Sequence, residues 1–425
     1  MLILCIVATA MATFGYRINR RYDHPICLFC GLWAFILFLF SIQLFQTIPL
    51  SASTEAIMWT MILSFFGGSI CHSTIRQYRQ QCRSIRYKSV AKSGDKVVLN
   101  APVFWVLCGI TIAVMLRDEL QIILKLIGGY SFRDIMREAG GKATVTITGS
   151  FNVFLYMFIV HPFSVCVHPI CAIEYFSDKK KWSYLVVDLV IVALNVAHHG
   201  GRNSIIVFAL CYILVFSMLG KKVVLTKRQK KGVTILFACA AVLIFAISGS
   251  RGIEDIWLSF YAYLICALPL CTTYLSYPFV MTHLTYGFLS FKGIFYPLNT
   301  ILAKFGLSLP TAYADSTVVY RIIEDNYESI GNYRSTSMNT FIPAGAYFYI
   351  DGGIIFELIC MLLYGAVATY LYDQARISKD KKSVALYVMF GYAMLLSFTR
   401  LYFSSYQHMI GLLYIALIVY RKPRR

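Results

Sequence analysis

Charged side chains are scarce in this chain of 425 residues: only 14% are Asp, Glu, Lys or Arg, whereas 58% are hydrophobic. A soluble domain carries about 25% charged residues, so water cannot be the solvent for most of this surface. The motifs of several enzyme classes are also missing, because no GxxxxGK, GxSxG, HExxH or DxD occurs. Nucleotide hydrolysis, serine hydrolysis and zinc proteolysis are therefore without support, and the sequence requires no divalent metal or cofactor.

Linkers are lacking as well. No Pro-rich, Gly/Ser-rich or low-complexity stretch and no internal repeat divides the chain, so we expect one integral domain over residues 1–425. The 13 cysteines lie mostly in apolar runs, which is typical of packing residues and not of a disulfide framework. Cys27 and Cys30 form one CxxC, but no second pair or His cluster completes a zinc site.

Apolar runs long enough to cross a bilayer recur along the chain. They lack the alternation of apolar and polar residues found in barrel strands, and a bilayer otherwise accepts only helices. We therefore predict an all-α polytopic membrane protein with about 11 transmembrane helices. The predicted spans are residues 1–16, 26–46, 54–73, 102–116, 149–176, 182–198, 203–219, 232–248, 353–372, 383–399 and 405–420.

The basic residues predict the orientation of these spans. Arg17, Arg20 and Arg21 follow the first run and none precedes it, which is the reverse of a secretory signal peptide. If spans alternate from there, 27 of the 39 Lys and Arg residues lie on one face, which the positive-inside rule assigns to the cytoplasm. The N-terminus is then outside and the C-terminus cytoplasmic. The net charge of +19 is an orientation signal, and we expect no nucleic-acid partner.

Two outer segments are longer than the other connections, and long segments of this kind are usually functional. Residues 117–148 include a predicted amphipathic helix on the outer interface. Residues 250–350 form a large extracytoplasmic loop, whose front part is apolar enough to enter the bilayer. An odd number of crossings there would reverse the charge pattern, so we predict a re-entrant or interfacial hairpin broken at Pro269 and Pro278.

Four arginines near the outer face stand out because arginine is otherwise concentrated in the cytoplasmic loops. An arginine at a membrane boundary is costly unless it pairs or faces a polar cavity, and its planar fork suits a pyrophosphate group. The alternative is snorkelling at a helix end, or pairing with a nearby acid such as Asp315 or Asp351. The four are Arg202, Arg251, Arg334 and Arg400.

Candidate bases lie in the same outer parts of the chain. His283, Asp315 and Glu324 fall in the 250–350 loop, where one of them could deprotonate a sugar hydroxyl. His199 lies close to Arg202, and Tyr286 belongs to a set of tyrosines suited to the membrane interface or to stacking on sugars.

The polar residues inside the predicted spans are not candidates for the functional site. They are expected to form hydrogen bonds between helices and to have no role in chemistry. They are His161, His168, Asp188 and His408.

Two patches of this sequence, with the topology, resemble a known family. One is GGRNSIIVFAL, in which glycines precede Arg202; the other is Asn339-Thr340-Phe341 followed by Tyr349-Ile350-Asp351-Gly352-Gly353. Ten residues separate Arg334 from Gly345, as in the arginine-x10-glycine pattern of some members, but the companion copy is missing because Ile213 stands eleven residues after Arg202, where the pattern has glycine. The chain resembles the oligosaccharide repeat-unit polymerases, the Wzy-type O-antigen and capsule polymerases of bacteria.

The resemblance implies a GT-C-like glycosyltransferase of the bacterial cytoplasmic (inner) membrane, with its active site facing the periplasm or cell exterior. It would join undecaprenyl-pyrophosphate-linked oligosaccharide repeat units into a surface polysaccharide, beside a chain-length regulator and a flippase of the same pathway. In that reading Arg202 and Arg334 are catalytic, with a base among His283, Asp315 and Glu324. The residues that would contact pyrophosphate or glycan are Arg202, Arg251, Arg334, Arg400, His199, Asn339 and Tyr286.

Three other functions remain open from the sequence. An O-antigen ligase shares an arginine-rich outer loop but transfers the glycan to the lipid A core. A lipid-linked oligosaccharide flippase or other transporter would show broken helices and polar residues at the membrane midplane. A scaffold subunit of an envelope-assembly complex would leave the outer arginines free to vary.

Overall fold

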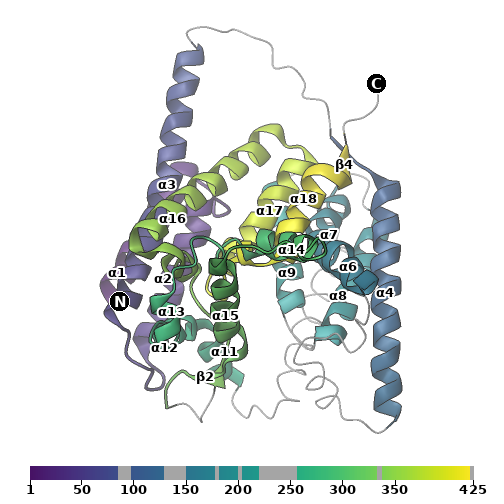
Figure 1. Cartoon of the computed structure of the whole chain (residues 1–425). Coiled ribbons are helices and arrows are strands. Elements are labelled where there is room, and N and C mark those ends of the chain that lie inside the picture. The colour runs from purple at the N-terminus through teal and green to yellow at the C-terminus, as the bar shows by residue number, and fades with distance from the viewer. Residues whose placement is uncertain are drawn as a thin grey trace. The chain divides into compact units, whose positions relative to one another are not determined.

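The computed structural model describes residues 1–84, 97–128, 150–177, 181–199, 203–219, 256–332 and 337–421 (Figure 1). Within these ranges the regular structure is helical apart from two small antiparallel strand pairs, β1–β4 and β2–β3. Among the described residues, five helices are long and apolar enough to cross a membrane, or six if one bent pair counts as a single span. The chain is an all-α membrane protein.

The observed helices coincide with the predicted spans wherever the structure describes them. Every predicted run contains a helix except residues 232–248, which lie outside the described residues. Three further apolar helices are shorter, at Trp182–Ala197, Asn203–Leu219 and Tyr406–Val419. The total of 11 spans therefore stays a prediction.

The chain divides into two compact units, each described here by itself. The first unit contains residues 1–94, 253–377 and 390–406, and the second contains residues 95–252, 378–389 and 407–425. Helix α17 (Lys381–Leu395) begins in the second unit and ends in the first. All described candidate site residues other than His199 belong to the first unit.

The first unit begins with three helices, α1 (Leu2–Asn19), α2 (Pro25–Ile42) and α3 (Ala52–Ser84). Helix α2 starts where it does because the His24 side chain accepts a hydrogen bond from the Ile26 amide and a proline occupies the first helical position. It ends at Gln43, whose backbone is left-handed.

Helices α3 and α16 (Ala344–Ser378) approach backbone to backbone (Figure 1). A Cβ at Gly68 would lie 1.8 Å from the Leu362 carbonyl oxygen, and a Cβ at Gly365 would lie 2.1 Å from that of Phe65. Only glycine fits both positions, so these two residues set the close packing that small residues give membrane helices. The Ser69 hydroxyl adds a hydrogen bond of 3.1 Å to the Gly365 carbonyl.

Helix α16 is broken near its start. Gly352 and Gly353 leave the helical conformation, and the φ of 73° at Gly353 is one that side-chain-bearing residues rarely adopt. The predicted span 353–372 begins at this break, whereas the helix itself starts nine residues earlier, at Ala344. The Asp-Gly-Gly sequence therefore marks a break within the helix and not its beginning.

The outer segment 250–350 contains mostly short helices. Helices α11 (Ile256–Ile265) and α12 (Ala267–Leu275) form a pair bent by 47°, either a broken span or a re-entrant loop. The bend falls at Cys266, whereas Pro269 lies inside α12 and Pro278 opens α13. The remaining elements are α13 (Pro278–Thr282), α14 (Lys292–Ala303), α15 (Thr311–Asp325), β2 (Glu328–Ser329) and β3 (Ser337–Met338). A short 3-10 helix, η3 (Tyr402–Ser404), completes the unit.

The second unit is built around α7 (His161–Tyr175), which is buried along nearly its whole length. Its other elements are β1 (Val98–Leu99), α4 (Ala101–Ile127), α6 (Ser150–Leu155), η1 (Tyr156–Val160), α8 (Trp182–His199), α9 (Asn203–Leu219), α18 (Tyr406–Leu413), η4 (Tyr414–Val419) and β4 (Tyr420–Arg421). The start of the predicted outer segment, residues 117–127, continues α4, and its amphipathic part lies outside the described residues.

One predicted hydrogen bond between helices is confirmed in this unit. The His168 Nδ1 atom on α7 lies 2.7 Å from Oδ1 of Asp188 on α8, and the two side chains are 2% and 0% exposed. The pair thus joins two helices inside an apolar core.

Candidate functional site

Several predicted site residues fall outside the part of the chain that the structure describes. Arg202, Arg251 and Arg334 are among them, and of His199 only its place at the end of α8 is described. The geometry of the site therefore rests on the remaining predicted residues, which are Arg400, Glu324, Asn339, His283, Asp315 and Tyr286.

Arg400 and Glu324 form an ion pair although 76 residues separate them. The guanidinium Nη1 lies 3.3 Å from Oε1 of Glu324, and Nη2 donates to Oε2 across 3.4 Å. Each nitrogen thus faces one oxygen, one through a hydrogen bond and one through an ion contact, and an arginine fork placed in this way can also hold a phosphate. The side chains are 30% and 19% exposed, so a ligand could reach the pair.

The surroundings of Arg400 keep it charged. Burial is the largest single effect and lowers the pKa of Arg400, but the opposing effects, of which the negative field of Glu324 is the largest, together raise the pKa above the ordinary value. Burial and the same carboxylate raise the pKa of Tyr320, so this phenol stays protonated at neutral pH. The cluster thus offers one fixed cation and one neutral hydroxyl.

Asn339 holds the end of α15 in place. Its Nδ2 atom donates to the backbone carbonyl of Glu324, and the amide of the next residue, Thr340, donates to the Ile323 carbonyl across 2.9 Å. Asn339 was predicted to contact the ligand, but its described contact is with the backbone that carries Glu324. It therefore positions the carboxylate.

Lys292 is a second cation in contact with α15, and the sequence-based prediction, which named only arginines as outer cations, did not include it. Its side chain is nearly buried; Nζ donates to the Thr317 hydroxyl across 3.2 Å and lies 4.5 Å from the centre of the Tyr320 ring. A cation over an aromatic face is stabilised by the ring quadrupole. A lone lysine in the apolar sequence SFKGIFYP, within an outer segment, was the available signal.

One face of α15 carries all of these contacts. Tyr313, Thr317, Tyr320 and Glu324 follow one another at spacings of four, three and four residues, which places them in a row along the helix. Lys292 contacts the first three, and Arg400 contacts the last. We call the row with Lys292 and Arg400 the α15 cluster. It presents two cations, two phenols and one carboxylate along a single helix.

Three predicted residues do not join the α15 cluster through any described contact. The His283 Nδ1 atom is engaged locally, 3.1 Å from the Phe279 carbonyl oxygen and 2.9 Å from the Thr282 hydroxyl. Asp315 precedes Glu324 by nine residues, which is roughly 14 Å along a helix, so both cannot act on one hydroxyl. Tyr286 is 71% exposed and interacts with α16 through its backbone amide.

Asp351 has a structural partner and no arginine among its described contacts. Its carboxylate accepts hydrogen bonds from the Thr285 hydroxyl and from the amides of Leu289 and Ser290. The side chain is fully buried next to the α16 break, so it anchors the loop before α14. This loop leads directly to Lys292.

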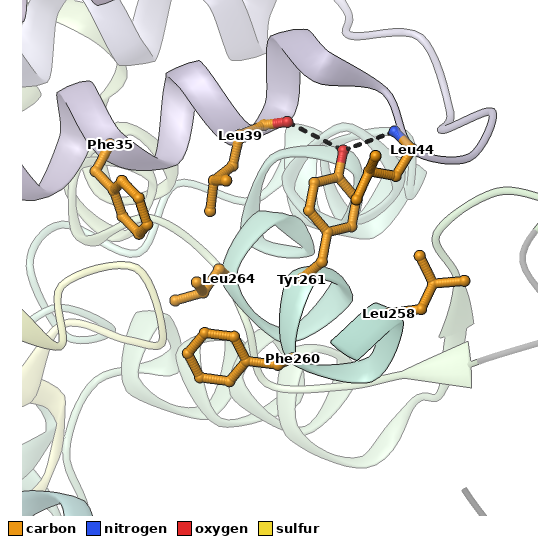
Figure 2. Close-up of a pocket in the computed structure, with 7 residues that line it drawn as sticks. All are labelled: Phe35, Leu39, Leu44, Leu258, Phe260, Tyr261 and Leu264. Atoms are coloured by element: carbon orange, nitrogen blue, oxygen red, sulfur yellow. Dashed lines mark hydrogen bonds between the residues drawn. The ribbon is translucent and has the colours of Figure 1, made fainter. Parts of the chain in front are cut away.

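An apolar groove of about 380 Å³ opens between α2 and α11 (Figure 2). The hydroxyl of Tyr261 donates to the Leu39 carbonyl across 3.0 Å and accepts from the Leu44 amide, so the end of α2 already uses it. Two of the lining rings, Phe35 and Phe260, are more than half exposed. The lining residues are Phe35, Leu39, Leu44, Leu258, Phe260, Tyr261 and Leu264. Such a surface suits a hydrocarbon chain.

Comparison with known proteins adds no assignment: no family model, no curated protein and no solved structure matches this chain. Among the described residues no group of three or more His, Cys, Asp or Glu side chains could hold a metal ion. What the site can do must therefore be argued from the α15 cluster itself.

Proposed function

We propose that this protein is a glycosyltransferase that polymerises polyprenyl-pyrophosphate-linked oligosaccharide repeat units at the outer face of a bacterial cytoplasmic membrane. The observation that carries the proposal is the α15 cluster, in which a partly exposed arginine–glutamate pair lies on the same helix face as a nearly buried lysine. The family resemblance of the sequence and the apolar groove support the same function.

The leaving group of this reaction is a diphosphate, which needs fixed positive charge. The Arg400 fork can bind two of its oxygens, and Lys292 can supply a second charge on the same helix face. Cations that are already in place stabilise the charge that develops on the leaving group without reorganisation.

The carboxylate of the pair can serve as the base. In the resting site Arg400 holds Glu324, and an arriving diphosphate competes for the guanidinium and releases the carboxylate. The bond between the donor's anomeric carbon and the diphosphate oxygen breaks with its electron pair going to the diphosphate, a new bond forms to the acceptor hydroxyl oxygen, and Glu324 takes the hydroxyl proton. The polyprenyl tail would occupy the groove between α2 and α11.

The finer features of the prediction belong to this proposal. They are the 11 spans with an outer N-terminus, the inner-membrane location, the pathway partners, and the roles of Arg202, Arg251 and Arg334. Their positions in the sequence support these roles, because they place three more arginines on the proposed outer face.

The test is the glycan ladder of a host whose own copy of the gene is replaced by variants. Arg400→Ala and Glu324→Gln should leave single repeat units, and Arg400→Lys should restore the ladder poorly because an ammonium lacks the fork. Arg321→Ala is the matched control, since Arg321 is exposed on the same helix and should leave the ladder intact. Full-length ladders in both site variants at normal membrane levels would remove the proposal.

A transporter of lipid-linked oligosaccharides is a second candidate, because two features of the first unit are typical of transporters. Helix α16 is broken at Gly352 and Gly353, and α11 and α12 form a bent pair. Loss of a transporter would leave lipid-linked repeat units on the inner leaflet, whereas loss of a polymerase would leave them on the outer leaflet. Lectin labelling of intact cells separates these outcomes.

A further inference from the structure

A buried acid lies in the apolar part of α16, apart from the α15 cluster. The Glu357 side chain is fully buried, and neither carboxylate oxygen has a hydrogen-bond partner among the described residues. It follows the helix break by four residues, in a segment apolar enough to cross a membrane. An ionisable group in such a place is expensive to keep and therefore calls for a functional explanation.

The break in α16 brings this carboxyl group back against the start of the same helix. A Cβ at Gly345 would lie 2.6 Å from Oε1 of Glu357 and 3.0 Å from the Cβ of Met61 on α3. Glycine at 345 therefore makes the room that the carboxyl group occupies. The first turn of α16, whose amides point toward its N-terminus, also provides a partial positive charge near the group.

A chain of hydroxyl groups leads from the start of α3 toward Glu357. Ser51 is partly exposed, and its hydroxyl lies 3.0 Å from that of buried Thr54, which in turn lies 3.0 Å from the hydroxyl of Thr272 on α12. Cys271, the residue before Thr272 on α12, is fully buried, and its thiol interacts with Thr54 and with the Glu357 carboxyl group. Hydroxyl and thiol groups can both donate and accept a proton.

No charged side chain acts on Glu357 from the three elements around it. On α12 the titratable neighbour is Cys271; on α3 the adjacent residue is Met61; on α16 it is Gly345. Neither carboxylate oxygen forms a hydrogen bond within the described residues. An unpaired carboxylate anion in these surroundings is strongly disfavoured, and binding of a proton removes that cost.

We propose that Glu357 is a proton-binding site inside the first unit, loaded from the solvent through the chain Ser51–Thr54–Cys271. A proton from water at Ser51 enters the chain, each group passes one proton on, and the last proton converts the Glu357 carboxylate to the acid. No other atom is transferred and no electron moves. This site does not depend on the proposed glycosyl transfer, because none of its groups belongs to the α15 cluster.

The test measures the carboxylic acid directly in the full chain. Infrared difference spectra after transfer into heavy water report the carbonyl stretch of a protonated acid and the rate at which its proton exchanges for deuterium. We expect a band in the parent chain that Glu357→Gln abolishes. Thr54→Val should keep the band but slow its exchange about tenfold, whereas Thr272→Val, which removes only a branch from Thr54, should leave the exchange rate unchanged. Thr369→Val is the matched control, since its hydroxyl is buried on the same helix but bonds the Gly365 carbonyl.

Labelling with a hydrophobic carbodiimide, which reacts with protonated carboxyl groups in apolar surroundings, provides a second readout. Mass spectrometry should find the adduct on Glu357 in the parent chain and in both threonine variants. A band that survives in Glu357→Gln, or absence of an adduct on Glu357, would overturn the proton site. An unchanged exchange rate in Thr54→Val would overturn the proposed path.

Discussion

The two units of this protein each contain a paired acid, and the pairs differ in exposure. In the second unit His168 and Asp188 lie 2.7 Å apart at 2% and 0% exposure. In the first unit Arg400 and Glu324 lie 3.3 Å apart at 30% and 19% exposure. A pair sealed between two apolar helices can only join them, whereas a looser, partly exposed pair can exchange its partner for a ligand. Exposure therefore distinguishes these two pairs.

Two further groups of the first unit sharpen this contrast. His24 is fully buried and forms the cap of α2, so by the same reasoning it should behave like the pair of the second unit. Lys292 contacts the row of side chains that also carries Glu324, so it should behave like Arg400. Three substitutions can break or support the comparison.

The largest effect is expected at Asp188. Asp188→Ala removes the partner of a buried histidine, and breaking a buried ion pair from one side costs about 3–5 kcal/mol. The free energy of unfolding in detergent should fall by that amount, while Asp188→Asn, which keeps a polar partner, should cost less. A loss below about 1 kcal/mol would show that the pair does not hold α7 and α8 together.

His24 should give a pH-dependent effect of intermediate size. Burial lowers the pKa of His24 to about 4, against the opposing fields of Asp373 and Asp23, from an ordinary value of 6.5. Since the unfolded chain binds this proton more readily, stability is present above pH 6.5 and is lost as the pH falls toward 4. The loss is about 3 kcal/mol.

His24→Asn should keep the helix cap and remove the titration. Thermal unfolding of the parent chain and the variant, compared between pH 7 and pH 4.5, isolates the contribution of His24. If the two curves run parallel across that range, His24 is not buried in its neutral form.

Lys292 should give the smallest effect. Lys292→Met keeps the length of the side chain and removes one of two cations in the α15 cluster, so the polymerisation rate should fall about tenfold with little change in stability. The rate of ladder growth in isolated membranes, normalised to protein amount, measures it. Lys304→Met is the control, because Lys304 is exposed at the end of α14. Equal effects of the two substitutions would place Lys292 outside the site.

The sequence predicted the helices better than it predicted what they bring together. Apolar runs located α2 and α9 to within a few residues because bilayer-spanning length and composition are local properties. The sequence also selected Arg400 and Glu324 separately. It could not pair them, since 76 residues and several short helices lie between them.

Two other features of the first unit were not predicted from the sequence. Glu357 stands alone in an apolar run, and only the break at Gly352 and Gly353 brings it against Gly345. The sequence placed Gly345 in the arginine-x10-glycine pattern of the family. The structure shows that this glycine makes room for a carboxyl group. Lys292 was not predicted because only arginines were named as outer cations.

The proposed function requires the α15 cluster to face the outside of the cell. Arg321→Cys places a thiol on the exposed side of α15, three residues from Glu324, and Ser378→Cys places one at the end of α16, on the proposed cytoplasmic side. Intact cells are treated with a membrane-impermeant maleimide, and labelling is compared with that of the parent chain. We predict labelling at residue 321 in intact cells and at residue 378 only after permeabilisation. The reverse pattern would contradict both the orientation and the proposed function.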